Sequence, residues 1–493
     1  MSLLKKLAGE TAIYGGATIL SHLLNFIIIT PYLTRIFSGE RAEYGIHGLM
    51  YAYAGLLMVL LTYGMETAFF RFGRQEEDRE RAFSTASISL LSTTVFLGAL
   101  MFFFAPEIAG LLTQPSDSAY VVYFALILGF DVLCAIPFAR LRMENRPMRF
   151  AMLKIVNVAV NATLILFFLE ILPWLGSEYA LFQGLYLPDH ELHYVFIANL
   201  LASLVTFIML LPYWRKVNWQ FDRALWYKML GYALPLVVVG LSGMINQLAD
   251  RFFITALLPG SREENLDQLG IYNACIKIAV LMNLFTQAFK YAAEPFFFNH
   301  ADRSDARSLY AQIGQAFTLV GAVAFLGIQL YLDYIQNLID ADFREGLGIV
   351  PITLIAYLFL GIYYNFSAWY KLTDQTHIGA YISVGGAVVT IVLNVLLLPR
   401  IGYAGSAWAS LACFGCMMAA GYLLGQRHYP IPYPIGRMAL YIVLAVGIYF
   451  LSEVTKVEDQ ILRTVINTGW MVLYLLLVYG MERKGLFLRR AAH

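Results

Sequence analysis

A small set of charged side chains lies inside long apolar stretches of this chain, where a charge is costly. The members, acidic residues first, are Glu66, Asp131, Asp250, Glu294, Lys154, Arg251, Lys277 and Lys290. A charged side chain at the centre of a lipid bilayer costs roughly 2.5–3.5 kcal/mol on insertion scales, so each one needs a partner or a function. The cations suit an anionic ligand such as a phosphate, and the carboxylates suit coupling to a cation gradient.

Helical spacing places several of these charges beside amide side chains on one helix face. The polar stripes with this spacing are Lys154 with Asn157 and Asn161, Asn246 with Asp250, Asn273 with Lys277, and Lys290 with Gln287 and Glu294. We expect these stripes to face a polar cleft between helices rather than lipid.

The amide stripes and the last charge pair also have a purely structural interpretation. Asn161 and Asn246 could join neighbouring helices, since hydrogen bonds between spanning helices are worth about 0.6 kcal/mol on average. Lys290 and Glu294 could pair with each other at i, i+4 near the cytoplasmic end of their helix. Both interpretations stay open at the level of the sequence.

The remaining charges differ in whether a partner lies nearby in the sequence. Asp250 and Arg251 are adjacent, so their side chains leave the helix about 100° apart, and they could latch to other helices. Lys154 and Lys277 have no obvious local carboxylate, which makes them the better candidates for contact with a ligand. Asp131 is then either their counter-ion or a site for a coupling ion.

Membrane-spanning helices must position all of these residues. Hydrophobic residues occupy 59% of the 493 positions and charged residues only 14%, whereas soluble chains carry roughly 25% charged residues. About 20 apolar residues span the hydrocarbon layer as a helix, and the runs here lack the alternation of a barrel strand. The sequence therefore predicts an all-α, polytopic transmembrane helix bundle. The fourteen expected spans are 12–36, 44–70, 85–105, 119–139, 151–172, 194–213, 230–258, 269–298, 311–332, 347–369, 378–398, 402–424, 436–452 and 462–480.

Lys and Arg in the connecting segments indicate the orientation, because the cytoplasmic loops of membrane proteins are enriched in both. With the N-terminus in the cytoplasm, the basic groups around Arg71, Arg142, Lys216 and Arg489 all fall on the cytoplasmic side. The longest segment on the opposite side, 173–193, carries acidic residues but no Lys or Arg. Both termini are therefore expected in the cytoplasm.

The chain also matches itself at a nearly constant offset. The matching segments, first copy before second, are Leu20-Ser21-x-x-x-Asn25 and Leu241-Ser242-x-x-x-Asn246, Gly45-Ile46 and Gly270-Ile271, and Pro173-x-x-Gly176 and Pro399-x-x-Gly402. Their order predicts two parallel six-helix repeats, 1–214 and 215–428, followed by an additional helix pair and tail, 429–493. Parallel repeats of this kind occur in transporters, where they enclose a central cleft.

Several classes of function lack their motifs here. The sequence contains no G-x-x-x-x-G-K-[ST], no H-E-x-x-H and no G-x-S-x-G, and we expect neither an enzyme nor a cofactor. Cys413 and Cys416 form a C-x-x-C inside an apolar span, where cysteine usually behaves as a small hydrophobe. We therefore expect no metal, and no nucleic acid as a partner.

A series of short motifs begins at the seventh span. Each motif alone is weak evidence for a family, but their order and spacing are more specific. The segments are Tyr232-Ala-Leu-Pro235, Leu241-Ser242-Gly243, Ala249-Asp250-Arg251-Phe-Phe-Ile254, Leu269-Gly270-Ile271-Tyr272-Asn273-Ala274 and Leu396-Leu-Leu-Pro399-x-x-Gly402-Tyr-x-Gly405-Ser-Ala407. In order and spacing the chain resembles bacterial polysaccharide flippases of the multidrug/oligosaccharidyl-lipid/polysaccharide exporter superfamily. The resemblance extends over essentially the whole chain.

The resemblance implies a cargo built as an oligosaccharide on a polyprenyl diphosphate. Such cargo is flipped from the cytoplasmic to the outer leaflet of the bacterial inner membrane, by alternating access, for surface polysaccharide biosynthesis. The candidates for contact with its diphosphate and sugar are Lys154, Asn157, Asn161, Asn246, Arg251, Asn273, Lys277 and Lys290. The candidates for ion coupling are Asp131, Glu66, Asp250 and Glu294. Membrane lipids and the polysaccharide polymerase or export machinery are the other partners that the resemblance implies.

Three alternative functions stay open. Fourteen spans are typical of peptidoglycan lipid II flippases in this superfamily, whereas many polysaccharide flippases have twelve, so lipid II remains a candidate cargo. A cation-coupled multidrug antiporter of the same superfamily would need a cleft dominated by carboxylates, whereas acids and bases are about equally frequent in the central spans here. A membrane-embedded glycan polymerase or ligase would need a large outer loop, and the longest one here is 173–193.

Overall fold

The computed structural model describes residues 16, 19–20, 23–179, 182, 184, 186–300, 303–373 and 375–490. Over this part of the chain every regular element is helical, and there is no β-strand. Thirteen of the described helical stretches are long and apolar enough to cross a membrane. They correspond one to one to the second to fourteenth expected spans, so the predicted all-α transmembrane bundle is confirmed.

The first expected span, 12–36, lies partly outside the described residues. Its described end consists of the π-helix η1 (Asn25–Ile29) and the helix α2 (Thr30–Ile36). The count of fourteen spans therefore stays a prediction.

The helices of the first part of the chain follow one another with short connections. Their bounds are α3 (Arg41–Thr62), α4 (Met65–Phe72), α5 (Glu76–Phe103), α6 (Ala105–Leu112), η2 (Pro115–Asp117), α7 (Ser118–Met143), α8 (Pro147–Leu166), η3 (Phe167–Ile171), α9 (Leu172–Glu178), α10 (Glu191–Trp214) and α11 (Arg223–Leu257). The remaining elements are α12 (Arg262–Asn299), α13 (Ala306–Leu330), α14 (Leu332–Ile335), η4 (Gln336–Leu338), η5 (Ala341–Ile349), α15 (Val350–Phe366), α16 (Ala368–Leu372), α17 (Thr376–Ile401), α18 (Ala404–His428), α19 (Ile435–Val454) and α20 (Gln460–Arg490).

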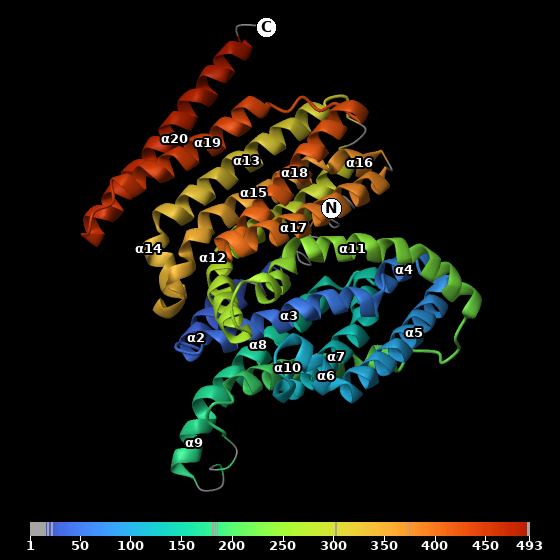
Figure 1. Ribbon diagram of the computed structural model, residues 1–493. Helices are drawn as coiled ribbons and strands as arrows, with labels where there is room; N and C mark the ends of the chain where they lie inside the picture. Colours follow the sequence, from blue (N-terminus) through green and yellow to red (C-terminus); the bar gives the residue numbers. More distant parts are fainter. Residues whose placement is uncertain are drawn as a thin grey trace. The chain divides into compact units, whose positions relative to one another are not determined.

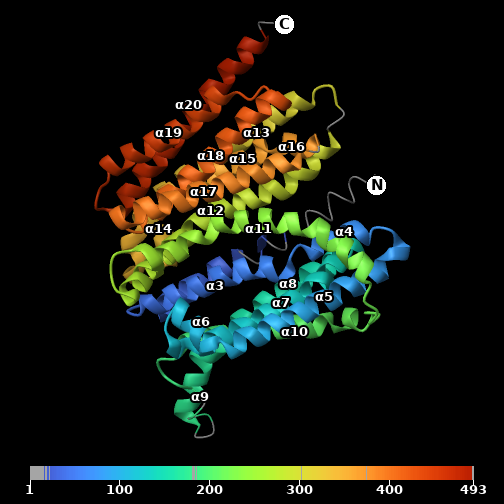
Figure 2. The same ribbon diagram turned by 45° about the vertical axis from the view of Figure 1, so that its right-hand side comes forward.

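The chain divides into two compact units. The first consists of residues 1–273 with 383–406, and the second of residues 274–382 with 407–493. Within the first unit α11 packs on α3 and α4, while α7 packs on α5 and α10 (Figure 1). Within the second unit α13 packs on α15 and α19, and α20 lies along α19 (Figure 2). The division into 1–214, 215–428 and 429–493 that the internal repeat suggested stays a prediction.

The second expected span is interrupted between α3 and α4. Tyr63 and Gly64 both adopt positive φ, 30° and 73°, which ends a helix and is a conformation that glycine adopts readily. A Cβ atom on Gly64 would also lie 3.0 Å from the Ala233 carbonyl oxygen on α11. Glu66, expected within a continuous span, therefore lies in the short separate helix α4.

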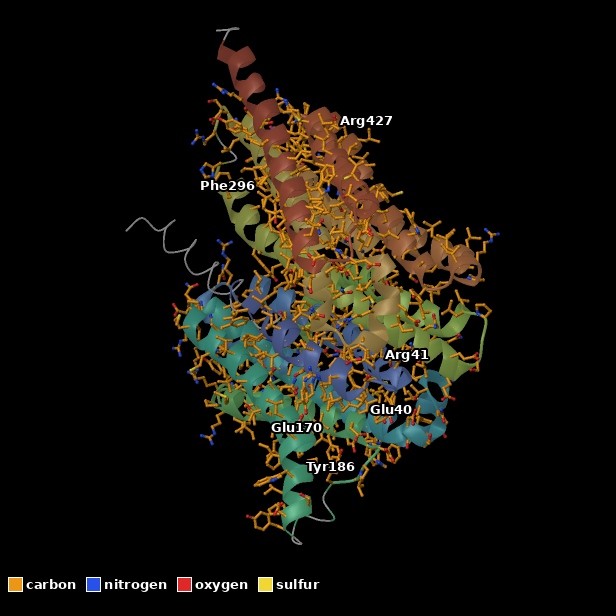
Figure 3. All side chains as sticks on the ribbon, turned by 90° about the vertical axis from the view of Figure 1, so that its left-hand side faces the viewer. Glu40, Arg41, Glu170, Tyr186, Phe296 and Arg427 are labelled. Carbon is orange, nitrogen blue, oxygen red and sulfur yellow. The ribbon has the colours of Figure 1, made fainter. Side chains whose placement is uncertain are left out.

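Large apolar side chains remain exposed on several spanning helices, as expected for a surface that faces lipid. On α5 the Phe103 side chain is 74% exposed, and on α20 the Leu476 side chain is 62% exposed. Apolar patches of this extent are rare on soluble proteins. Figure 3 shows side chains projecting from the outer helices, with polar residues such as Glu40 and Arg41 gathered near helix ends.

Candidate functional site

The structure places most of the candidate residues in three groups, two in the first unit and one in the second, and leaves Glu66, Lys277 and Glu294 outside them. Within neither unit do they converge on a single point. Each group has its own way of compensating charge, and that difference decides what each can do.

The first group lies where α7, α8 and α10 pack together. The Asp131 carboxylate lies near the Ser203 hydroxyl, and Lys154 is close enough to attract the same carboxylate. The Lys154 ammonium also lies 4.6 Å from the centre of the Phe138 ring, a distance at which the ring face attracts a cation. The sequence left two roles open for Asp131, counter-ion to the lysines or site for a coupling ion, and both stay predictions. We call Asp131, Lys154, Ser203 and their neighbours the Lys154 cluster.

The amides of the same helix face complete the Lys154 cluster. Asn157, one turn beyond Lys154 on α8, donates from Nδ2 to the Thr206 hydroxyl at 3.0 Å, which joins α8 to α10. Asn161, one further turn along, is half-buried, and its Oδ1 atom accepts no hydrogen bond from the residues that the structure describes. Asn157 therefore contributes to helix packing, whereas the Oδ1 atom of Asn161 accepts no hydrogen bond from the described residues.

The second group is centred on the adjacent pair Asp250 and Arg251 of α11. The long Arg251 side chain folds back, and its Nη1 atom lies 2.8 Å from Asp250 Oδ1 and 3.1 Å from the Gln247 carbonyl oxygen. The Tyr272 hydroxyl of α12 donates to the other Asp250 oxygen. The side chains of Arg251 and Asp250 are only 14% and 5% exposed. The pair is thus joined internally, as well as to another helix as expected of a latch.

A close crossing of α3 and the first turns of α12 holds this second group. A Cβ atom on Gly45 would lie 2.0 Å from the Leu266 carbonyl oxygen, and one on Gly270 would lie 2.0 Å from the Arg41 carbonyl oxygen. Glycines at both positions let the two backbones touch, as in other close crossings of spanning helices. Arg41 also pairs with Asp267, with Nε and Oδ1 2.8 Å apart.

The two remaining amides of the first unit serve the same packing. Asn273 presses its amide against Gly48, where a Cβ atom would lie 2.0 Å from Asn273 Nδ2. Asn246 donates from Nδ2 to the Ser383 carbonyl oxygen of α17 at 3.1 Å. Both amides are buried, and both are placed as contacts between helices.

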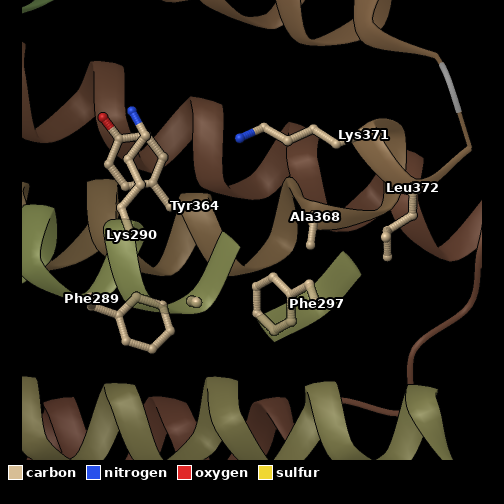
Figure 4. A pocket seen from close by; sticks show the side chains of 8 residues that line it. Phe289, Lys290, Phe297, Tyr364, Ala368, Lys371 and Leu372 are labelled. Carbon is tan, nitrogen blue, oxygen red and sulfur yellow. The ribbon is translucent and has the colours of Figure 1, made fainter. Parts of the chain in front are cut away.

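The third group is a pocket in the second unit, formed by α12, α15 and α16. It is a small, open pocket, and it is lined by Phe289, Lys290, Ala293, Phe297, Tyr364, Ala368, Lys371 and Leu372. The Lys290 ammonium lies 4.6 Å from the centre of the Tyr364 ring. Figure 4 shows the Lys371 side chain extending toward Lys290 and Tyr364. We call this the two-lysine pocket.

The aromatic walls of the two-lysine pocket are fixed by packing. The Phe289 ring lies 4.3 Å from that of Phe317, and the Phe297 ring lies 5.0 Å from that of Tyr310. Gln287 of α12 lies beside the Tyr364 hydroxyl. The pocket therefore has a shape set by its surroundings.

Lys371 and Tyr364 were not among the residues selected from the sequence. Lys371 falls in an expected cytoplasmic segment just after the span 347–369, where a lysine is ordinary. The structure continues the helical path as α16 after a break at Ser367, which turns Lys371 toward the pocket. The two aromatic residues directly before it, Trp369 and Tyr370, were the available signal that this segment is not a solvated loop.

Other candidates have different surroundings. Glu66 pairs with Arg142, with Oε2 and Nη2 2.7 Å apart and both side chains about one-third exposed. Lys277 is half-buried on α12 in the second unit. Glu294 lies on α12, but its side chain is outside the described part of the chain, so its pairing with Lys290 stays a prediction.

Metal ligation is not suggested within the described residues. Among them, no group of three or more His, Cys, Asp or Glu side chains could hold a metal ion. Cys413 is buried and contacts the Met417 sulfur at 3.8 Å, while Cys416 is exposed. The C-x-x-C pair is thus split between the interior and the surface.

Comparison with known proteins gives the family. The sequence pattern of the polysaccharide biosynthesis protein family matches residues 7–299, more than half of the chain. The chain belongs to this family. It is also 26% identical, over 248 residues, to the uncharacterized membrane protein YabM of Bacillus subtilis strain 168. That match covers 47% of this chain and 46% of YabM, less than two thirds of the relative's length.

Solved structures share the fold across most of the chain. The lipid II flippase MurJ in an inward closed conformation matches with a TM-score of 0.71 and 14% identity, covering 99% of this chain and 100% of that one. A MATE transporter in complex with MaD3S matches with a TM-score of 0.58 and 12% identity, covering 89% and 96%. Identities this low establish the fold alone. The expected resemblance to the superfamily that includes these transporters is confirmed, and the chain is a multi-pass membrane protein of that fold.

Proposed function

We propose that this chain is a flippase for a polyprenyl-diphosphate-linked oligosaccharide. It would move this cargo from the cytoplasmic to the outer leaflet of the bacterial inner membrane, for surface polysaccharide biosynthesis, by alternating access. The observation that carries the proposal is the presence of lysines on spanning helices, Lys154 and Lys277 among them, in a member of the polysaccharide biosynthesis family. A diphosphate that leaves water needs such cations nearby.

Asp131 is our candidate for ion coupling. Its carboxylate is half-buried and lies near Ser203 and Lys154, so a proton or cation at Asp131 would change the charge that Lys154 meets. Asp250 is engaged by Arg251 and Tyr272, and Glu66 forms a partly exposed pair at the end of its span. Both are less suited to bind and release an ion during a cycle.

Deletion of the gene in its host tests the proposed function. Surface polysaccharide should be lost, and the lipid-linked oligosaccharide should accumulate on the cytoplasmic face of the inner membrane. A plasmid copy of the wild-type gene should restore both. Normal surface polysaccharide in the deletion strain, without such accumulation, would contradict the proposal.

Lipid II is a second candidate cargo because of the last helix pair. The match to the lipid II flippase structure covers 99% of this chain, whereas the match to the MATE structure covers 89%. Depletion would then cause lysis and accumulation of lipid II rather than loss of surface polysaccharide. Analysis of the lipid-linked saccharides in depleted cells by mass spectrometry separates the two cargoes.

A further inference from the structure

We propose that a pocket between α3, α5, α6 and α7 binds a phospholipid of the outer leaflet, with one acyl chain in the pocket and the phosphate at Arg262. These four helices and Arg262, the first residue of α12, all belong to the first unit (Figure 1). The inference concerns a bound membrane lipid and does not rest on the proposed cargo.

The first argument is the chemistry of the pocket walls. The pocket measures about 250 Å³, and its buried floor consists of the apolar side chains of Met50, Val121, Phe124 and Leu128. Among the described side chains that line it, only that of half-buried Tyr53 carries a polar group. A buried water needs roughly two to four polar partners, and an apolar cavity of roughly 150 Å³ stays dry and takes up benzene. The walls therefore suit a hydrocarbon rather than water.

The second argument is that a space of this size is unfavourable when empty. Side chains that line a void lose dispersion contacts, and the loss grows with the volume of the void. In a bilayer the acyl chains of the surrounding lipids are the apolar material at hand. Met50 and Met101 lie on opposite walls, on α3 and α5, and the flexible side chain of methionine adapts to an irregular apolar ligand.

The third argument is the place at which the pocket opens. Its rim consists of half-buried side chains of α3, α5 and α6, namely Tyr53, Ala54, Leu57, Met101, Ile108 and Leu112. Next to this rim in the chain, Phe102 and Leu111 are 61% and 79% exposed. Large exposed apolar side chains on spanning helices mark the surface that faces lipid. The opening is therefore continuous with the lipid-facing surface, from which an acyl chain can enter.

The fourth argument is a cation at the outer end of the pocket. Arg262 donates from Nη1 to the Gly110 carbonyl oxygen at 2.9 Å and from Nη2 to the carbonyl oxygen of Leu111, next to the rim. Its charge is close enough to act on the Tyr53 hydroxyl. Arg262 is exposed, and no carboxylate of the described residues pairs with it. A guanidinium has five N–H donors, so donors remain for a phosphate, which arginine binds well.

The depth of the pocket agrees with this arrangement. In the predicted orientation, the end of α6 and the start of α12 both lie on the outer side of the membrane. Leu128, on the pocket floor, lies ten positions after the start of α7 at Ser118, a distance of about 15 Å along the axis. This is half of the roughly 30 Å hydrocarbon layer. A lipid with its phosphate at Arg262 would therefore extend its chain into the pocket within the outer leaflet.

Photocrosslinking of the purified full-length chain tests the position of the acyl chain. Phosphatidylglycerol with a diazirine at the end of one acyl chain is added in detergent, and mass spectrometry identifies the labelled peptides. We expect the label on pocket residues of the four helices, and about tenfold less of it in Ala54→Phe, which fills the pocket. Ala99→Phe adds the same ring to an exposed position of α5 and should leave the labelling unchanged.

A second filling variant separates filling from misfolding. Ile108→Trp fills the pocket from α6 and should reduce the labelling as Ala54→Phe does. Each variant should elute as the wild type does in gel filtration, and the comparison uses those that do.

Titrations followed by native mass spectrometry test the position of the phosphate. Arg262→Gln should raise the Kd for phosphatidylglycerol about tenfold, or about 1.4 kcal/mol. The Kd for diacylglycerol, which has the chains without the phosphate, should change less than twofold. Arg262→Lys keeps the charge and should raise the Kd for phosphatidylglycerol less than Arg262→Gln does. An unchanged Kd for phosphatidylglycerol in Arg262→Gln would overturn the assignment of the phosphate.

The remaining outcomes identify other occupants. Labelling that is unchanged in folded Ala54→Phe and Ile108→Trp would overturn the proposal. Geranylgeranyl diphosphate that displaces phosphatidylglycerol at a tenfold lower concentration would assign the pocket to an isoprenoid lipid and overturn the phospholipid. Inorganic phosphate binding as tightly as phosphatidylglycerol would also overturn it, because no chain would then be needed. None of these results bears on the flippase function, which the gene deletion tests separately.

Discussion

The Lys154 cluster and the two-lysine pocket place membrane-embedded cations in opposite surroundings. Lys154 faces the Asp131 carboxylate and the Phe138 ring, whereas Lys290 shares its pocket with a second lysine, Lys371. The first cation is compensated by the protein itself. The second lies over a neutral aromatic ring, that of Tyr364.

This difference predicts different changes in stability when a charge is removed from each region. A charge pair inside a helix bundle is strongly destabilised when one partner is removed, because the other charge is left behind. Lys290 lies over the neutral Tyr364 ring, and replacing it leaves no charge behind on that ring. Substitutions in the two regions should therefore change the free energy of unfolding by different amounts.

The largest expected effect comes from making the two-lysine pocket resemble the Lys154 cluster. Ala293→Asp introduces a carboxylate among the pocket residues, one turn from Lys290. We expect the Kd for the proposed polyprenyl-diphosphate cargo to rise about a hundredfold, or about 2.7 kcal/mol, because the new carboxylate competes with the diphosphate for Lys290. Ala293→Asn has the same shape without the charge and should change the Kd less than fivefold. Equal effects of Asp and Asn would attribute the loss to shape and contradict the comparison.

The second prediction removes the negative charge from the Lys154 cluster. Asp131→Asn removes the carboxylate that faces Lys154, and we expect the free energy of unfolding to fall by about 2 kcal/mol. Fully buried pairs lose about 3–5 kcal/mol, and this one is half-buried. The double variant Asp131→Asn with Lys154→Gln should recover at least half of the loss. Thermal unfolding in detergent measures the loss for each single variant and for the double variant. Additive losses would show that the two side chains do not interact.

A smaller effect is expected when one lysine of the pocket is neutralised. Lys290→Gln should leave the thermal unfolding temperature nearly unchanged, because the contact that it removes is with the neutral Tyr364 ring. Lys154→Gln is the matched substitution in the other region and should lower it, since Asp131 loses its cation. Equal decreases in both variants would contradict the distinction between the two regions.

The smallest expected change in stability concerns the ion pair between Asp222 and Arg81 near the start of α11. The Leu225 N–H donates to Asp222 at 2.9 Å, and this bond, with Arg81 beside it, lowers the pKa of the Asp222 carboxyl. A lowered folded-state pKa contributes stability above the unfolded pKa of about 3.9, which is lost as the pH falls through the folded value. Asp222→Asn should thus lower the unfolding temperature slightly at pH 7, and the difference from wild type should vanish on acidification. A difference that persists after the folded-state carboxyl has been protonated would indicate another cause.

Much of the fold follows from the sequence because each spanning helix is a local property. Thirteen described helices match expected spans, since length and apolarity alone suffice to specify them. The interruption at Tyr63 and Gly64 was not expected, because the apolar run continues across it and the turn depends on a close approach of Ala233 from α11. Contacts between helices of this kind leave no periodic trace in the sequence.

The candidate sites were predictable only in part, for the same reason. Helical spacing correctly grouped Lys154 with Asn157 on one face, but not with Ser203 or Asp131, which come from other helices. Lys371 was missed because its position just after a span resembles an ordinary cytoplasmic lysine. The packing of the helices decides which charged side chains lie close together. A local stretch of sequence carries no signal for contacts between different helices.

Flipping in proteoliposomes tests the central claim most directly. Purified wild-type chain is reconstituted with a fluorescent polyprenyl-diphosphate oligosaccharide, and a membrane-impermeant quencher reports the fraction of probe in the outer leaflet. We predict fast redistribution with the wild type and with Lys228→Gln, which removes an exposed lysine from α11, and redistribution slowed at least about tenfold with Lys290→Gln. Redistribution by the wild type no faster than in protein-free liposomes would contradict the flippase function. An unaltered rate with Lys290→Gln would contradict the contact expected between Lys290 and the diphosphate.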